Sequence, residues 1–159
     1  MNVVESGKLR NVAVVGHGHT GKTSLVEAIL FDTGATNRLG RVEDGNTVTD
    51  FEPEEKSKLY SIATSLAACN WNKHRINLLD TPGGANFVTE AFHALDVADA
   101  ALLTVCAASG VEVQTEKLWD AAEKRGMPRA FFVNKLDRER ANFDQVLRDL
   151  HDSFKINVV

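Results

Sequence analysis

Residues 16–23 read Gly16-His17-Gly18-His19-Thr20-Gly21-Lys22-Thr23, which matches the pattern GxxxxGK[ST]. An apolar run, Asn11–Val15, precedes this stretch, and a helical pattern of apolar residues, Leu25–Phe31, follows it. Spaced glycines let a backbone turn so that successive N–H groups point at a phosphate, and the helix that follows adds the positive end of its dipole. The pattern therefore predicts a phosphate-binding loop between a buried strand and a helix.

Two side chains at the end of this loop have specific roles in such a site. We expect Lys22 to reach the β- and γ-phosphates of a nucleotide, and the Thr23 hydroxyl to coordinate Mg²⁺. His17 and His19 can also be read as a metal-binding pair. Within a loop that works through its backbone, however, they are more simply side chains without that role. A chance match to a glycine-rich turn is a weak alternative, because a strand and a helix stand on either side.

A second motif, residues 75–83, reads Arg-Ile-Asn-Leu-Leu-Asp-Thr-Pro-Gly. An aspartate at the carboxyl end of a strand, here Asp80, is how proteins with this phosphate loop place an acceptor near the Mg²⁺ ligands. Gly83 has the conformational freedom to turn its N–H toward a γ-phosphate. Alone, the motif is weak evidence, but here it follows the phosphate loop, a helix and a long polar loop.

A third motif, residues 131–137, reads Phe-Phe-Val-Asn-Lys-Leu-Asp. A carboxylate at Asp137 can accept hydrogen bonds from both N1–H and the 2-amino group of guanine. Adenine lacks that pair of donors, and leaving the carboxylate unpaired would be unfavourable by a few kcal/mol. Asn134 and the aliphatic stem of Lys135 would support the base. The motif therefore favours GTP over ATP and argues against an ATPase or a kinase.

The rest of the chain alternates short β-like runs with helical patterns, which is typical of α/β proteins. A short polar joint, Asn72–His74, connects the runs Ser61–Trp71 and Arg75–Leu79, and predicts a hairpin with one antiparallel strand. Residues 32–58 show no pattern and predict a long functional or mobile loop. Further strands are expected at Ala100–Val105 and Ala130–Val133, and helices at Ala85–Leu95, Glu112–Lys124 and Asn142–Phe154.

Composition excludes several classes of protein. The chain has 159 residues, which suggests one domain, and a net charge of −4 without any basic run, which argues against direct DNA binding. The longest apolar stretch, Ala100–Ala108, is far shorter than the roughly 20 residues of a membrane span, and no signal-peptide pattern opens the chain. Cys69 and Cys106 stand in apolar surroundings as expected for reduced core thiols. We therefore expect a cytoplasmic protein.

The three motifs, in this order and spacing, resemble those of the translational GTPases, in particular elongation factor G and elongation factor G-like paralogues. The resemblance covers nearly the whole chain. It implies a P-loop NTPase fold of three layers, α/β/α, with a mostly parallel sheet and one antiparallel strand. It also implies a GTP-binding and GTP-hydrolysing domain with Mg²⁺ as cofactor. The parent would act on the ribosome, in translocation or a related step.

The resemblance also marks three departures from the family. A histidine usually follows Asp-Thr-Pro-Gly and orients the attacking water, whereas this chain has Gly84; such a group contributes roughly 10²–10⁴ in rate. The alternative function is therefore a GTP-binding switch module with little hydrolysis. Residues 59–62 align with a Gly-Ile-Thr-Ile-like stretch whose threonine binds Mg²⁺, so Ser61 keeps the hydroxyl. His19 stands where an acidic residue is common.

The resemblance gives a complete expected site. The nucleotide-binding residues are Gly16, His17, Gly18, His19, Thr20, Gly21, Lys22, Thr23, Ser24, Asp80, Gly83, Asn134, Lys135 and Asp137. Lys22 and the Gly84 position belong to the catalytic machinery, and Thr23, Ser61 and Asp80 to the Mg²⁺ site. The family's later Ser-Ala-like loop, which closes over guanine, does not occur before Val159. We therefore expect residues 1–159 to be one GTP-binding domain without its last strand and helix.

Overall fold

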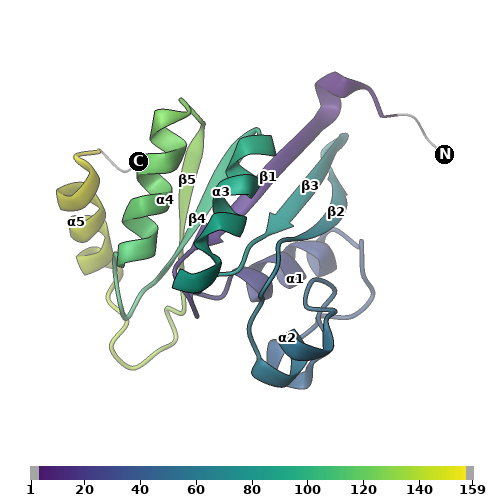
Figure 1. Cartoon of the computed structure of the whole chain (residues 1–159), viewed down its shortest axis with the longest axis horizontal. Helices are drawn as coiled ribbons and strands as arrows, with labels where there is room; N and C mark the ends of the chain where they lie inside the picture. Colours follow the sequence, from purple (N-terminus) through teal and green to yellow (C-terminus); the bar gives the residue numbers. More distant parts are fainter. Residues whose placement is uncertain (1–3, 157–159) are drawn as a thin grey trace.

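Five strands form one mixed sheet in the order β2-β3-β1-β4-β5 in the computed structural model, which describes residues 4–156 (Figure 1). They are β1 (Leu9–Gly16), β2 (Ser65–Trp71), β3 (His74–Asp80), β4 (Ala100–Cys106) and β5 (Arg129–Asn134). β1 lies at the centre, parallel to β3 and β4, and β5 runs parallel to β4. β2 pairs antiparallel with β3, which confirms the predicted hairpin.

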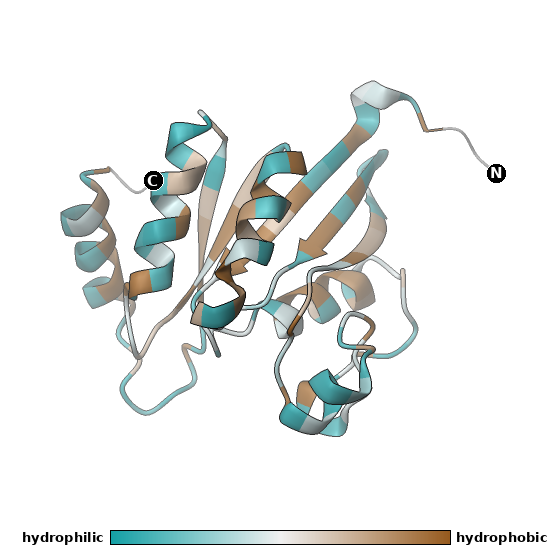
Figure 2. Cartoon of the chain, in the orientation of Figure 1, coloured by the Kyte–Doolittle hydropathy of each residue, from teal (hydrophilic) through white to brown (hydrophobic). Residues whose placement is uncertain are grey.

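Helices cover both faces of this sheet, so the expected α/β/α layering is confirmed. On one face, Val26 and Leu30 of α1 (Lys22–Asp32) pack against Val14 of β1. On the other, α3 (Val88–Val97), α4 (Val113–Lys124) and α5 (Phe143–Phe154) pack against the apolar residues that alternate with that set. Hydrophobic residues accordingly follow the strands, whereas hydrophilic ones dominate the outer sides of the helices (Figure 2).

Hydrophobicity predicts a packing role for both tryptophans, Trp71 and Trp119, but the two differ in their surroundings. Trp119 of α4 is buried and stacks on Phe131 at 5.0 Å and on Phe154 at 4.6 Å between ring centroids. Trp71 is 61% exposed, so the expected packing role is wrong for this residue. It ends the edge strand β2 beside the hairpin turn, where no layer of the described chain covers it.

Three element boundaries differ from the expected ones: those of the hairpin turn, of β2 and of the helix that follows Gly84. The hairpin turn consists of Asn72 and Lys73, whose φ angles of +45° and +64° suit the tight two-residue turns of hairpins. The strand expected from Ser61 begins only at Ser65, because Ser61 is bound to Asp50 and the Ile62 N–H to Glu55 instead of to a neighbouring strand. The helix expected from Ala85 begins with a 3₁₀ turn and becomes α-helical at Val88.

The long loop between α1 and β2 has more structure than its composition suggests. It contains a 3₁₀ turn, Val42–Asp44, and a short helix α2, Pro53–Lys58, so the absence of pattern was misleading. Pro53 occupies the first turn of α2, and Glu52 and Glu55 form a capping box. Thr47, Thr49, Asp50 and Glu55 are buried. Polar contacts rather than apolar periodicity hold this segment.

The remaining expectations concern the ends and the core thiols. The apolar stretch after α5 lies largely outside the described residues; Ile156, the last one described, packs against the larger core cluster. Both cysteines are buried free thiols, as expected. Within residues 4–156, no helix has the length and apolar character needed to cross a membrane.

Candidate nucleotide-binding site

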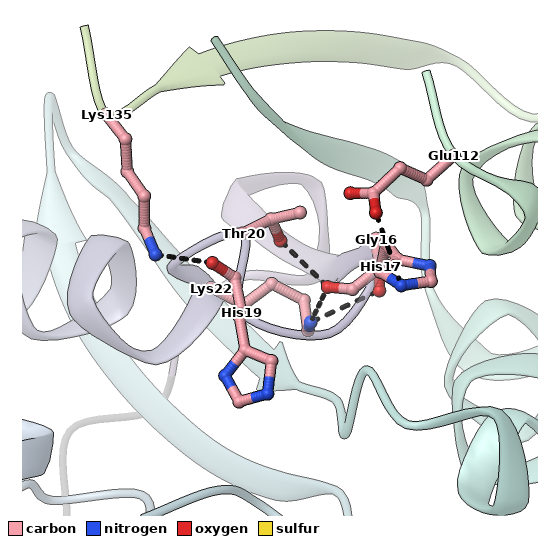
Figure 3. Close-up of polar contacts among 7 residues, drawn as sticks. All are labelled: Gly16, His17, His19, Thr20, Lys22, Glu112 and Lys135. Carbon is pink, nitrogen blue, oxygen red and sulfur yellow. Dashed lines mark hydrogen bonds and ion pairs between the residues drawn. The ribbon is translucent and has the colours of Figure 1, made fainter. Parts of the chain in front are cut away.

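The phosphate-binding loop lies where β1 ends and α1 begins, as predicted (Figure 3). Gly21 precedes the helix with a left-handed φ of +92°, a conformation that glycine adopts without strain. Lys22 Nζ donates to the carbonyl oxygens of Gly16 (3.2 Å) and His17 (2.9 Å), so the ammonium lies inside the loop. Burial lowers the pKa of Lys22 to about 8, and an anion beside it would raise that pKa again.

The loop is fastened to two neighbouring elements. Thr20 Oγ1 donates to the carbonyl of His17 (3.0 Å) and lies 2.7 Å from Thr104 Oγ1 of β4. His17 Nε2 lies 3.4 Å from Glu112 Oε1, just before α4. The imidazole of His19 is exposed and points away from that of His17 (Figure 3), so the two histidines do not form a metal-binding pair.

Oxygen ligands gather beside the loop at the end of β3. Thr23 Oγ1 lies 3.2 Å from Ser61 Oγ, which donates to Asp50 Oδ1 at 2.6 Å. Thr49 Oγ1 donates to Asp80 Oδ2 at 2.8 Å, while Asp80 Oδ1 is buried without a hydrogen-bond partner among the described residues. Thr23, Ser61 and Asp80, expected from the sequence as metal ligands, are thus brought into one cluster.

The electrostatics of this cluster suit a hard cation. Burial raises the pKa of Asp80 to about 6, although the hydroxyls of Thr49 and Thr23 and the charge of Lys22 oppose the shift. Burial likewise raises the pKa of Asp50. Two buried carboxylates, one of which has an unpaired oxygen, and two hydroxyls form the kind of oxygen-rich set that Mg²⁺ prefers. A divalent cation here would lower both pKa values.

Gly83 and Gly84 face different surroundings. A Cβ at Gly83 would overlap Lys22 Nζ and lie 2.8 Å from Gly18 Cα, so close packing against the phosphate loop requires glycine there. The sequence suggested torsional freedom instead, but the φ of Gly83 is not in the left-handed region. Gly84 is exposed and borders a cavity of about 240 Å³ with His19, Tyr60 and Phe87. It contributes no side chain to that cavity.

The third motif also reaches the phosphate loop. Asn134 Nδ2 donates to the carbonyl of Thr20 (2.9 Å), and Lys135 Nζ donates to that of His19 (Figure 3). Asp137 lies in the turn that follows and is exposed. A cavity of about 140 Å³ lies between the loop, the oxygen-rich cluster at the end of β3 and this motif. Its lining includes the expected residues His19, Gly21, Lys22, Thr23, Ser24, Ser61 and Lys135.

Four buried polar residues around the site escaped the sequence motifs: Glu27, Thr49, Asp50 and Glu55. Their only local signal is polarity, which a buried position does not distinguish from a solvated surface. Glu27 is the clearest case. The apolar spacing predicts that Leu25, Ala28, Ile29 and Leu30 form the inner face of α1, whereas the structure buries Leu30 together with Val26 and Glu27. Backbone N–H groups of the long loop satisfy its carboxylate.

Comparison with known proteins agrees with this geometry. The family model for the elongation factor Tu GTP binding domain matches residues 7–159. Elongation factor G of Salinibacter ruber is 42% identical over 96% of this chain and 22% of its own length. The mitochondrial ribosome-releasing factor 2 of Drosophila melanogaster is 41% identical over 97% of this chain and 21% of its own.

A solved structure is similar to this chain in both fold and sequence. The crystal structure of a Thermus thermophilus protein superposes with a TM-score of 0.87 at 45% identity, covering 93% of this chain and 22% of that one. The chain thus spans about a fifth of the length of the relatives it matches. By its motifs, its fold and these matches, the chain belongs to the family of elongation factor Tu GTP-binding domains, in the group related to elongation factor G.

Proposed function

We propose that this chain binds GTP with Mg²⁺ and hydrolyses it to GDP and phosphate, as the GTPase domain of an elongation factor G-like translation factor. The observation that carries the proposal is the gathering of Lys22, Thr23 and Asp80 at one end of the sheet, with Gly83 packed on the loop. Loop N–H groups, Lys22 and the start of α1 would hold the phosphates. Residues 1–159 would act as one such domain.

Thr23 and Ser61 would hold Mg²⁺, with Asp80 beside them, and the ion would neutralise the charge that develops on the phosphate oxygens. The unpaired buried oxygen of Asp80 supports this assignment, since a buried carboxylate oxygen without a partner is unfavourable. Asp50 holds Ser61 in place and Thr49 holds Asp80 in place through the hydrogen bonds described above.

Guanine would lie beside the third motif. Asp137 would accept hydrogen bonds from the base, and the stem of Lys135 would lie along it. The side chains of Asn134 and Lys135 are held by their bonds to the phosphate loop. Exposure of Asp137 leaves its carboxylate accessible to a ligand.

The alternative function, a switch module with little hydrolysis, rests on Gly84 alone and finds no support in the comparisons. The relatives are named for elongation and for ribosome release, which favours a ribosome-linked GTPase. The ribosome would then be the partner of the full-length parent, at translocation or a related step. We propose the cytoplasm as its compartment; the mitochondrial names among the relatives make an organelle the second candidate.

The proposal is tested by titrating the chain with fluorescent GDP, GTP and ATP analogues in Mg²⁺, alongside the Asp137→Ala variant. We expect guanine nucleotides to bind, ATP to bind far more weakly, and the guanine preference to vanish in the variant. Equal binding of ATP and GTP to the unmodified chain would contradict the assignment. Release of phosphate from bound GTP, measured in a single turnover, tests the hydrolysis.

A further inference from the structure

Glu27 of α1 is a buried acid with an unusual set of partners. Its side chain is 1% exposed, and both carboxylate oxygens accept hydrogen bonds from the backbone of the long loop. Oε1 accepts from the Val48 N–H at 2.6 Å, and Oε2 accepts from the Gly40 N–H at 3.1 Å. A carboxylate in the interior is unfavourable unless such bonds compensate it. Glu27 therefore ties the loop to α1.

The fit around this contact is tight. A Cβ on Gly40 would overlap Glu27 Oε2 and would lie 3.0 Å from Thr47 Cα. The loop backbone therefore approaches the carboxylate as closely as a residue without a side chain allows. This close approach fixes the position of the segment 40–48 relative to α1.

The tied segment leads directly into the oxygen-rich cluster at the end of β3. Val48 is followed by Thr49, which donates to Asp80, and by Asp50, which accepts from Ser61. At the other end of the loop, Glu55 accepts from the N–H groups of Ile62 (3.0 Å) and Ala63 (3.3 Å), next to Ser61. Glu27 itself lies one helical turn after Thr23 on α1. One short helix thus carries a metal ligand and the anchor of the loop that faces it.

We propose that Glu27 is a positioning residue of the Mg²⁺ site: it holds Thr49 and Asp50 so that Ser61 and Asp80 face Thr23. The proposal rests on the proposed function, since it concerns the metal that accompanies GTP. Glu27 does not touch the site itself. Ser65 also holds the Thr49 carbonyl, at 2.7 Å, so loss of Glu27 loosens the segment without releasing it.

The test compares Glu27→Gln with Glu54→Gln. Glu54 is an exposed glutamate of the same loop, whose side chain pairs only with Lys58 among the described residues. Glu27→Gln keeps the size of the side chain but replaces one carboxylate oxygen with an NH₂ group. That donor then faces a backbone N–H, of Gly40 or of Val48, which is also a donor. Two quantities are measured: amide hydrogen exchange at Gly40 and Val48, and the Mg²⁺ concentration that gives half-maximal binding of a fluorescent GTP analogue.

We expect Glu27→Gln to speed exchange at both amides, and to raise the Mg²⁺ midpoint by about tenfold, the effect of losing one hydrogen bond to a charged group. Affinity for the analogue in the presence of EDTA stays unchanged, and Glu54→Gln behaves like the unmodified chain. Gly40→Ala, which keeps the carboxylate but pushes the loop away from it, raises the midpoint too. It carries the test if circular dichroism shows that Glu27→Gln does not fold.

Faster exchange with an unchanged Mg²⁺ midpoint overturns the proposal, because Glu27 then only packs the loop. An equal rise in the midpoint for Glu54→Gln overturns it as well, since the effect would not be specific to the anchor. If the unmodified chain binds no guanine nucleotide at all, the proposed function itself fails, and the role of Glu27 in it fails with it. The first two results leave the proposed function standing.

Discussion

The phosphate end and the base end of this site are built differently. At the phosphate end, Lys22, Thr23 and Asp80 are buried, and Gly83 packs against the loop without room for a Cβ. At the base end, Asn134 and Lys135 are half-buried and Asp137 is exposed. The first region therefore depends on packing and backbone geometry, and the second on one accessible carboxylate.

The two ends are also connected by hydrogen bonds, and all the donors among them are side chains of the base end. The side chains of Asn134 and Lys135 donate to backbone carbonyls of the phosphate loop, so the base end is held by the phosphate end. The difference teaches that phosphate binding tolerates little change around it. Base selectivity, by contrast, can be removed by a substitution that leaves the fold intact. Four substitutions, at Lys22, Asp80, Asp137 and Gly84, test this contrast.

The largest effect is expected at Lys22. Lys22→Ala removes the buried ammonium that would face two phosphates, each through a charge-assisted bond of about 1.5–3 kcal/mol, so GTP affinity should fall by about 10³-fold. Lys135→Ala at the base end should lower GTP affinity by about tenfold, since it removes one solvent-accessible hydrogen bond, from Lys135 Nζ to the carbonyl of His19. Fluorescent-analogue titration measures both. Equal losses at the two lysines would show that the ends do not differ as described.

The second prediction concerns stability without nucleotide or Mg²⁺. The pKa of Asp80 is about 6 in the folded chain against an ordinary value of 3.8, so the folded state binds the proton more tightly. The contribution of Asp80 to the free energy of unfolding is therefore fully present below pH 3.8. It is lost as the pH rises through 6, and the loss is about 3 kcal/mol at most. Asp80→Asn should remove this loss and make the chain more stable than the unmodified one at pH 7.

Thermal unfolding at pH 4 and pH 7 measures this effect, and Asp137→Asn is its control. The same substitution at the exposed acid of the base end should leave the free energy of unfolding within about 0.5 kcal/mol of that of the unmodified chain at both pH values. If Asp80→Asn lowered the free energy of unfolding at pH 7, the contrast between an unfavourable buried carboxylate at the phosphate end and an exposed one at the base end would be refuted.

The third prediction addresses selectivity. Asp137→Ala should lower affinity for GDP by about 100-fold, because it removes an exposed carboxylate that would accept two hydrogen bonds from guanine, and should leave ATP affinity as it was. The unfolding temperature should not change, because the residue is exposed. Isothermal titration with GDP and ATP gives the ratio. A variant that loses both nucleotides equally would place Asp137 in the fold instead of in base recognition.

The smallest effect is expected at Gly84. Gly84→His places an imidazole at the edge of the cavity near the phosphate loop, where its Cβ would lie 3.2 Å from Phe87 Cδ2, a contact that a small ring shift relieves. Hydrolysis in a single turnover should rise by about tenfold, less than the roughly 10²–10⁴ that a positioned group contributes, because the chain alone does not fix the ring. Gly84→Ala, without an imidazole, serves as the control and should not raise the rate.

Much of the fold was accessible from local patterns. The strands β1, β3, β4 and β5, the hairpin and the three motifs were predicted within a few residues, because period and turn chemistry are local properties. The loop after α1 was not: residues 32–58 show no pattern and predicted no regular element, whereas Pro53 starts α2. Trp71 was expected to be a packing residue and is exposed, because hydrophobicity alone does not say which strand lies at the edge of the sheet.

The sequence by itself determined the chemistry of this protein: a phosphate loop, an aspartate after a strand and a guanine-type motif, each a short run of residues whose function follows from its local geometry. Only the tertiary structure decided what surrounds them. Burial raised the pKa of Asp80, and the fold placed Asp50 and Ser61 beside Thr23 and made Glu27 an anchor of the loop. The stability of a buried charged group depends on partners that lie far away along the chain, and no local sequence pattern shows which residues these are.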